Sequence, residues 1–109
     1  MPKVKLDKKG KVIITEAMTL HQVRSYLKAL GVFYWRNHQS LASFKGLPDL
    51  EGVYRRQHFY IEVKAPKGKL SEHQEKFLVN VQNEGEKVFV AFGFDAFRAE
   101  FDCWRRSVA

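Results

Sequence analysis

The sequence of 109 residues contains little of what disordered, fibrous or disulfide-stabilised chains contain in abundance. It has three Pro and seven Gly, too few for those first two classes. Its single cysteine, Cys103, excludes an internal disulfide and a zinc site made of several cysteines. Because Cys103 lies in a predicted amphipathic helix, we expect a reduced residue in the core.

Long apolar runs are also lacking. None approaches the roughly 20 residues that a helix needs to cross a bilayer, and no long hydrophobic segment follows the basic N-terminus. The cytoplasm is therefore the expected location.

Acidic residues are in the minority, with 12 Asp and Glu against 19 Lys and Arg. The resulting net charge of +7 favours a polyanionic partner such as nucleic acid. Residues 1–14 include five lysines and predict a basic arm, which could touch phosphates, or a short edge strand. Hydrophobic residues make up 45% of the chain, enough for one core, so residues 15–109 are expected to form a single domain.

The hydrophobic pattern predicts an α/β fold with the order helix, three strands, helix, strand, helix. A first helix capped by Thr15 or Thr19 should end at Gly31, and a second, with a capping box of Ser71 and Gln74, should end before Gly85. The expected strands are 32–36, 48–54, 59–64 and 87–92, with a loop at 37–47. A last helix, capped by Asp95, carries Phe97, Phe101 and Trp104 at helical spacing. A strand–helix–strand connection predicts that the last strand joins the sheet in parallel.

The most informative pair of segments is 48–54 and 59–64. Alternation in the second directs Phe59, Ile61 and Val63 to a core and Glu62 to the other face. If a hairpin turns at Arg55-Arg56, Asp49 faces Glu62. Directly opposed carboxylates repel each other, so a cation should lie between them, either a divalent metal ion or Lys64. Because these two arginines are unusual turn residues, a longer loop with a shifted register is the alternative.

Such a group of residues suits phosphodiester hydrolysis. A divalent metal ion polarises a phosphoryl oxygen and acidifies its bound water, and Mg²⁺ or Mn²⁺ prefers oxygen ligands. Asp49, Glu62 and the Val63 carbonyl could supply them. Lys64 could hold or deprotonate the attacking water or offset developing charge, and Gln74 could orient that water.

These residues resemble a known family. Pro48-Asp49 followed by Glu62-Val63-Lys64 is similar to the PD-(D/E)xK nuclease signature, and the element order resembles its αβββαβ core, a mixed sheet flanked by helices, here with a C-terminal helix. The closer resemblance is to the VRR-NUC (virus-type replication–repair nuclease) domain, especially small stand-alone phage-type members. The matching pieces are Thr15-Glu16, Tyr26-Leu27 with Gly31, Trp35-Arg36-Asn37, Gly46-x-Pro48-Asp49, Glu62-Val63-Lys64-Ala65-Pro66, Lys69-Leu70-Ser71 with Gln74, and Val88-Phe89-Val90-Ala91.

The resemblance implies a metal-dependent DNA endonuclease using Mg²⁺ or Mn²⁺, with a site made of Glu16, Asp49, Glu62, Lys64 and Gln74. Glu16, directly or through water, would join Asp49, Glu62 and the Val63 carbonyl at the metal. Stand-alone relatives are similar to homodimeric Holliday junction resolvases, and others are domains of DNA repair enzymes. The chain departs from the family at Leu20, where Gln is frequent.

Most of these side chains also have an ordinary structural explanation. Glu62 and Lys64 could be an exposed ion pair, Gln74 only a cap, and Glu16 only an acid favoured by the helix dipole. Arg36, Asn37, Lys45, Lys67 and Lys69 are candidates for binding DNA, or serve solubility. The four histidines show no zinc spacing. Phe101, Trp104 and the N-terminal segment are candidate dimer contacts. The alternatives to a junction resolvase are a nuclease for flaps, nicks or linear duplex, and a non-catalytic nucleic-acid-binding module.

Overall fold

The computed structural model describes residues 4–40 and 42–108. Lys3 of the basic N-terminus and Leu41 of the loop lie outside this range. In chain order the elements are β1 (Lys5–Leu6), β2 (Val12–Ile13), α1 (Glu16–Ala29), β3 (Phe33–Arg36), β4 (Leu50–Tyr54), β5 (Gln57–Lys64), α2 (Glu72–Asn83), β6 (Lys87–Phe92) and α3 (Phe94–Ser107). After the first two short strands, this is the predicted order.

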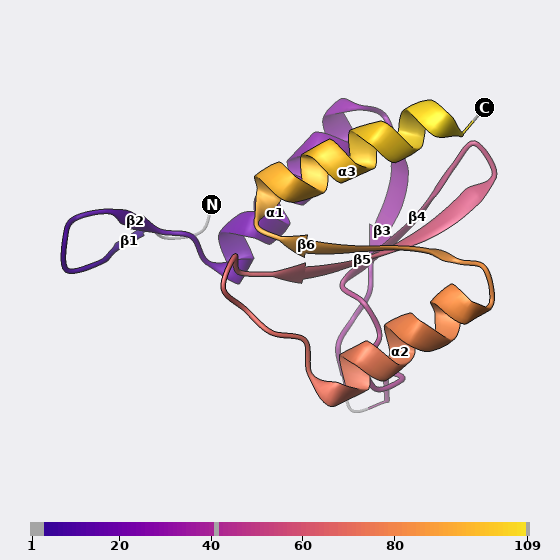
Figure 1. Ribbon diagram of the computed structural model, residues 1–109, viewed down its shortest axis with the longest axis horizontal. Helices are drawn as coiled ribbons and strands as arrows, with labels where there is room; N and C mark the ends of the chain where they lie inside the picture. The colour runs from indigo at the N-terminus through magenta and orange to yellow at the C-terminus, as the bar shows by residue number, and fades with distance from the viewer. Residues whose placement is uncertain (1–3, 41, 109) are drawn as a thin grey trace.

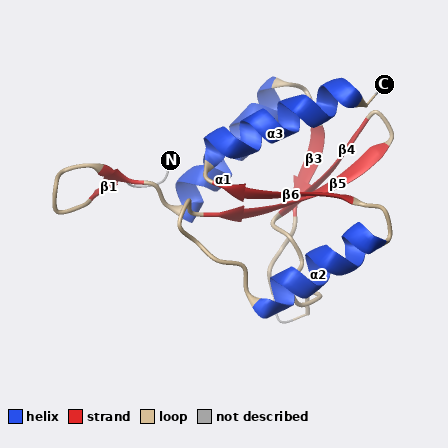
Figure 2. Ribbon diagram, viewed as in Figure 1, coloured by secondary structure: helices blue, strands red, loops and turns tan. Residues whose placement is uncertain are grey.

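The main sheet has the strand order β3-β4-β5-β6. Neighbours β3, β4 and β5 pair antiparallel, while β5 and β6 pair in parallel across the α2 connection, as predicted. Helices α1 and α3 lie on one side of the sheet and α2 on the other (Figure 1). The colouring by secondary structure in Figure 2 separates these three layers, and the predicted α/β fold with a mixed sheet is confirmed.

The core fills the space between the sheet and the α1–α3 layer. Phe59, Ile61 and Val63 of β5 are buried there, as the alternating pattern predicted. The same cluster contains Val23 and Leu27 of α1, Val32, Leu50 of β4, Phe89 and Ala91 of β6, and Phe97 and Phe101 of α3. Burial of these apolar surfaces is the main favourable contribution to folding, and it fixes the strands that carry the acidic residues.

The β4–β5 hairpin turns at Arg55-Arg56 and not through the longer loop that was the alternative. Arg55 and Arg56 form its two-residue turn with φ values of 47° and 70°. Positive φ at both positions is what a type I′ turn requires, so the hairpin adopts this conformation without the usual Gly or Asn. Leu50 consequently pairs with Ile61, and the predicted register is confirmed.

Of the two alternatives for the cap of α1, one is confirmed, whereas two predictions for α3 were wrong. Thr15 is the cap of α1, accepting a hydrogen bond from the Met18 N–H, whereas Thr19 is buried inside the helix. Helix α3 starts after Gly93 with no side-chain cap, so Asp95 lies in the first turn. Cys103 is exposed, not in the core, because the face toward the sheet carries Phe97, Phe101 and Trp104.

Phe101 is also not a dimer contact. Its side chain is fully buried within its own chain, where its ring lies against those of Phe59 and Phe89. Trp104 is half-buried and contacts the same rings.

The N-terminal segment does not add an edge strand to the main sheet. Instead, β1 and β2 pair with each other as a separate antiparallel hairpin that projects from the body of the molecule (Figure 1). No helix within residues 4–40 and 42–108 combines the length and apolar character needed to span a membrane.

Candidate active site

Asp49 and Glu62 come together at one end of the sheet. Asp49 directly precedes β4, and one step beyond the Leu50–Ile61 pair it stands opposite Glu62 in β5. Asp49 Oδ2 accepts a hydrogen bond of 2.8 Å from the Val63 N–H, which fixes the carboxylate against the neighbouring strand. Glu62 is only 2% exposed. The sequence therefore predicted the juxtaposition of the two acids but not the depth of Glu62.

The ionisation of Glu62 is strongly disfavoured in this position. Burial is the largest cause, and the adjacent Asp49 carboxylate adds to it; together they raise the pKa of Glu62 to about 9, with Lys64 acting in the opposite direction. The Oε2 atom of Glu62 is buried and has no hydrogen-bond partner. A buried polar atom without a partner carries a desolvation cost, so this oxygen is available to a ligand.

Lys64 and Glu16 lie beside this acidic pair. Lys64 shares the face of β5 that carries Glu62, two residues further along, and its side chain is largely buried. Its Nζ atom is 3.9 Å from Oε1 of Glu16, the first residue of α1. Glu16 contributes to raising the pKa of Glu62, which places its charge near the pair. The structure thus brings four of the predicted site residues together: Glu16, Asp49, Glu62 and Lys64.

Gln74 serves as both a helix cap and a neighbour of Glu62. Its Oε1 atom accepts a hydrogen bond from the Ser71 N–H, and the Ser71 hydroxyl accepts one from the Gln74 N–H, which completes the predicted capping box. The remaining amide nitrogen donates to Glu62 Oε1 over 3.3 Å. Because the cap fixes the amide orientation, Gln74 presents a donor to the site.

The turn that carries Asp49 is held by Asn37. Its backbone N–H donates to the Asp49 carbonyl at 2.8 Å, and its side-chain nitrogen donates to the Pro48 carbonyl and to Glu51 Oε2 at 2.9 and 2.7 Å. A phosphate only accepts hydrogen bonds, and the Asn37 amide donors are already used within the chain. The geometry therefore assigns Asn37 to supporting Asp49 and does not fit the predicted DNA contact.

Sequence reasoning missed a continuation of this network. His58 lies between two carboxylates, with Nε2 at 2.9 Å from Glu51 Oε1 and Nδ1 at 3.0 Å from Glu86 Oε2. Glu51 in turn accepts from Asn37. These residues come from β5, β4 and the segment before β6, so only knowledge of the strand register could have joined them. Through Asn37, the network supports the turn that carries Asp49.

The remaining DNA-binding candidates come from three segments of the chain. Lys45 is exposed in the loop between β3 and β4, and Lys67 and Lys69 are exposed in the connection from β5 to α2. Arg36 is exposed at the end of β3. Alternation along β3 separates its faces: Trp35 contacts His58, so Arg36 points to the opposite side, toward α1.

The oxygen atoms at Asp49 and Glu62 fit a hard divalent cation. They are carboxylate oxygens, one of them buried without a partner, and a dication would take the place of the proton that Glu62 otherwise retains. Within residues 4–40 and 42–108, no group of three or more His, Cys, Asp or Glu side chains is arranged to hold a metal ion by itself. Any further ligands would therefore be backbone carbonyl, water or substrate oxygens.

Comparison with known proteins agrees with this geometry. The family model of the VRR-NUC domain matches residues 5–95, which include every candidate site residue. No curated protein and no solved structure matches the chain. Since the match covers most of the 109 residues, the chain belongs to the VRR-NUC domain family of nucleases.

Proposed function

We propose that the protein is a metal-dependent, structure-selective DNA endonuclease that acts as a homodimeric Holliday junction resolvase. The observation that carries the proposal is the pairing of Asp49 and Glu62, with a buried Glu62 oxygen that lacks a partner and with Lys64 beside it. Membership of a nuclease family supports hydrolysis of DNA, and the net charge of +7 suits a polyanionic substrate.

Asp49, Glu62 and the Val63 carbonyl would hold Mg²⁺ or Mn²⁺, with Glu16 reaching the ion through water. When bound, the ion would lower the pKa of a water ligand and polarise the scissile phosphodiester. The negative charge of Asp49, and of Glu62 once it has lost its proton, would retain the ion. Neither acid has, among its hydrogen-bond partners in the described residues, an Arg that would neutralise this charge.

Lys64 and Gln74 would act on the attacking water and the phosphate. The Lys64 ammonium lies on the same strand face as Glu62 and would offset negative charge that develops on the phosphate oxygens. The Gln74 amide, held in place by its cap, would orient the water. Glu16, 3.9 Å from Lys64, would keep the ammonium directed into the site.

A dimer would account for symmetric cutting of the two strands of a junction. The projecting β1–β2 hairpin supports this part of the proposal. Its register places Val4, Leu6, Val12 and Ile14 on one face, and all four are exposed. An isolated two-stranded hairpin is marginally stable in water, so contact with a second copy would stabilise it.

A substrate panel tests the proposed function. Purified protein is incubated with labelled four-way junction, flap, nicked and linear duplex DNA in Mg²⁺ or Mn²⁺, and with EDTA as the control. We expect paired cuts in the junction and none in EDTA. Equal cleavage of all substrates would refute the junction preference and indicate the broader nuclease. Tight binding with no cleavage would contradict the enzyme and leave a binding module.

A further inference from the structure

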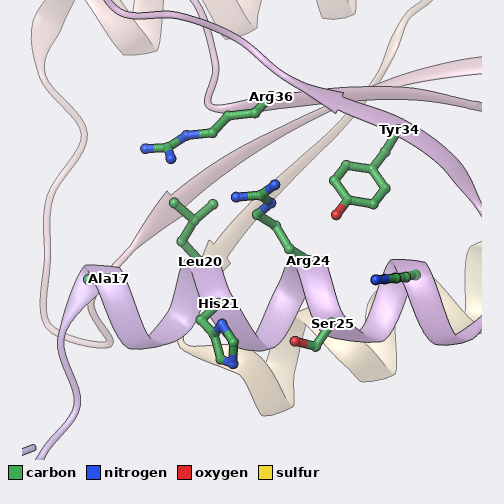
Figure 3. Close-up of a pocket in the computed structure, with 8 residues that line it drawn as sticks. Ala17, Leu20, His21, Arg24, Ser25, Tyr34 and Arg36 are labelled. Atoms are coloured by element: carbon green, nitrogen blue, oxygen red, sulfur yellow. The ribbon is translucent and has the colours of Figure 1, made fainter. Parts of the chain in front are cut away.

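A second charged site lies on the opposite side of the sheet from Glu62. A cavity of about 440 Å³ opens between α1 and β3. Its polar lining comes from His21, Arg24, Ser25, Lys28, Tyr34 and Arg36, with Ala17 and Leu20 providing apolar wall. Figure 3 shows Arg24 rising from α1 and Arg36 extending from β3 into the space between the helix and the strand. The lining contains three permanent cations and no carboxylate.

The cations of this cavity are not neutralised within the chain. Among the described residues, none of Arg24, Lys28 and Arg36 forms an ion pair, although Arg105, Lys64 and Lys87 elsewhere do. Arg24 Nε is buried without a hydrogen-bond partner, and its guanidinium lies 6.0 Å from the centre of the Tyr34 ring. Because a guanidinium stays protonated, it cannot relieve this cost by losing charge.

The sequence contains a signal for this cavity, which becomes visible once α1 is placed. Arg24 and Ser25 are three and four residues after His21, and Lys28 is four and three residues after them, so all four lie along one face of the helix. Leu20, on the neighbouring part of the helix surface, forms part of the wall. Arg36 and Tyr34 close the cavity from β3 only because their side chains alternate with Trp35.

The cavity is connected to the candidate active site by two elements. Helix α1 begins at Glu16 and reaches Arg24 eight residues later, a rise of about 12 Å. The strand β3 ends at Arg36, and the next residue, Asn37, donates to the Asp49 carbonyl. One strand of B-DNA rises about 3.4 Å per nucleotide. A DNA backbone that passes Asp49 and Glu62 can therefore bring to the cavity a phosphate that lies a few nucleotides from the cleaved one.

We propose that this cationic cavity binds a phosphate of the DNA backbone other than the one that is cleaved. Arg24 and Arg36 present planar forks of N–H donors that match phosphate oxygens, Lys28 adds charge, and the hydroxyl groups of Ser25 and Tyr34 are further donors. The inference rests on the proposed function for the identity of the polyanion as DNA. The cavity positions the substrate and takes no part in bond cleavage.

The test measures DNA binding without cleavage. Arg24→Gln, Arg36→Gln and, as a matched control, Arg106→Gln are made in an Asp49→Asn background and titrated with labelled junction and duplex in EDTA. Arg106 is exposed in the last turn of α3 and does not line the cavity. We expect Kd to rise about tenfold for Arg24→Gln and severalfold for Arg36→Gln. The slope of log Kd against log salt should fall by about 0.9 for each phosphate contact that is lost.

Arg36 is exposed, so its replacement should not disturb folding, and it keeps the test valid if Arg24→Gln is unstable. Arg24→Lys should restore part of the binding, since it keeps the charge but not the fork of donors. Affinities and slopes equal to those of Arg106→Gln for both variants would overturn the proposal. If the protein with its natural Asp49 cuts no DNA yet the two arginine variants bind weakly, the proposed nuclease fails and the cavity stands. If the protein with its natural Asp49 cuts DNA normally and the two arginine variants bind as tightly as Arg106→Gln, the proposed nuclease stands and the cavity proposal fails.

Discussion

The acidic site and the cationic cavity are alike in one respect and opposite in another. In the part of the chain that the structure describes, two buried side-chain polar atoms lack a hydrogen-bond partner, Glu62 Oε2 and Arg24 Nε. One belongs to an acid and the other to a base, on opposite sides of the same sheet. Native proteins satisfy nearly all such atoms, so these two exceptions of opposite charge support the two proposed ligands, a cation at one and a phosphate at the other.

The two regions differ in how they tolerate the missing ligand. Glu62 can remain protonated, and its pKa of about 9 shows that the neutral form is favoured in this environment. Arg24 stays charged and is stabilised by the Tyr34 ring and by contact with solvent at the open side of the cavity. The acidic site therefore responds to pH and to a cation, whereas the cationic cavity should respond to salt.

Replacing one acid should distinguish most clearly the role of the acidic site in cleavage from the role of the cationic cavity in DNA binding. Asp49→Asn should lower the cleavage rate by about 10³-fold or more, since it removes a negative charge proposed to hold the ion, while DNA affinity changes little. Lys64→Ala should have a similar effect. Gel assays of cleavage and anisotropy measurements of binding check this. Retained turnover in either variant would show that the wrong groups were assigned.

Salt should act on binding through the cationic residues. If about four phosphates are contacted, raising salt from roughly 50 to 200 mM should weaken DNA binding about 10²-fold through counterion release. Anisotropy titrations of the Asp49→Asn variant in EDTA measure this response without interference from cleavage. A flat response would contradict binding dominated by phosphate contacts.

The pH dependence of stability should depend on Glu62. Because its pKa is raised to about 9, the folded state binds more protons than the unfolded state between pH 4.5 and 9. In EDTA the free energy of unfolding should therefore fall as pH rises through this range and level off above it. Urea unfolding at several pH values checks this.

Glu62→Gln should remove that decline, because a neutral amide takes the place of the titrating carboxyl. Glu84→Gln, at an exposed position at the end of α2, is the matched control and should keep it. Equal pH profiles for the two variants would be inconsistent with a buried, protonated Glu62.

A smaller effect is expected at Gly46, which precedes the Asp49 turn in the chain and packs against the backbone at the start of α2. Gly46 has a φ of 82°, and a methyl group there would overlap the His73 carbonyl next to Gln74. Gly46→Ala should cost about 1–3 kcal/mol and reduce cleavage by displacing the start of α2. Thermal unfolding and cleavage assays measure the two effects. Gly31→Ala has a similar φ of 71° but open space around it, so it should cost less and leave cleavage unchanged.

The sequence predicted the acidic site because its geometry follows from local rules. The period of two in β5 sets the side-chain faces, the Arg55-Arg56 turn sets the register, and the capping box places Gln74 at the start of α2. These features fix Asp49 against Glu62 without knowledge of the rest of the fold.

The cationic cavity could not be predicted in this way, since it depends on the packing of α1 against β3. The bridge of His58 between Glu51 and Glu86 likewise joins segments whose neighbourhood is set by the sheet order. The same limit explains the errors at Asp95 and Cys103, where the orientation of α3 on the sheet decided capping and exposure.

The most direct test of the central claim is calorimetric titration of Mn²⁺ into the metal-free protein near pH 7, in two buffers of different ionisation enthalpy. If the dication replaces the proton on Glu62, about one proton should be released for each Mn²⁺ bound, and Glu62→Gln should abolish both the release and tight binding. Tight binding without proton release, or binding unchanged in Glu62→Gln, would contradict the account.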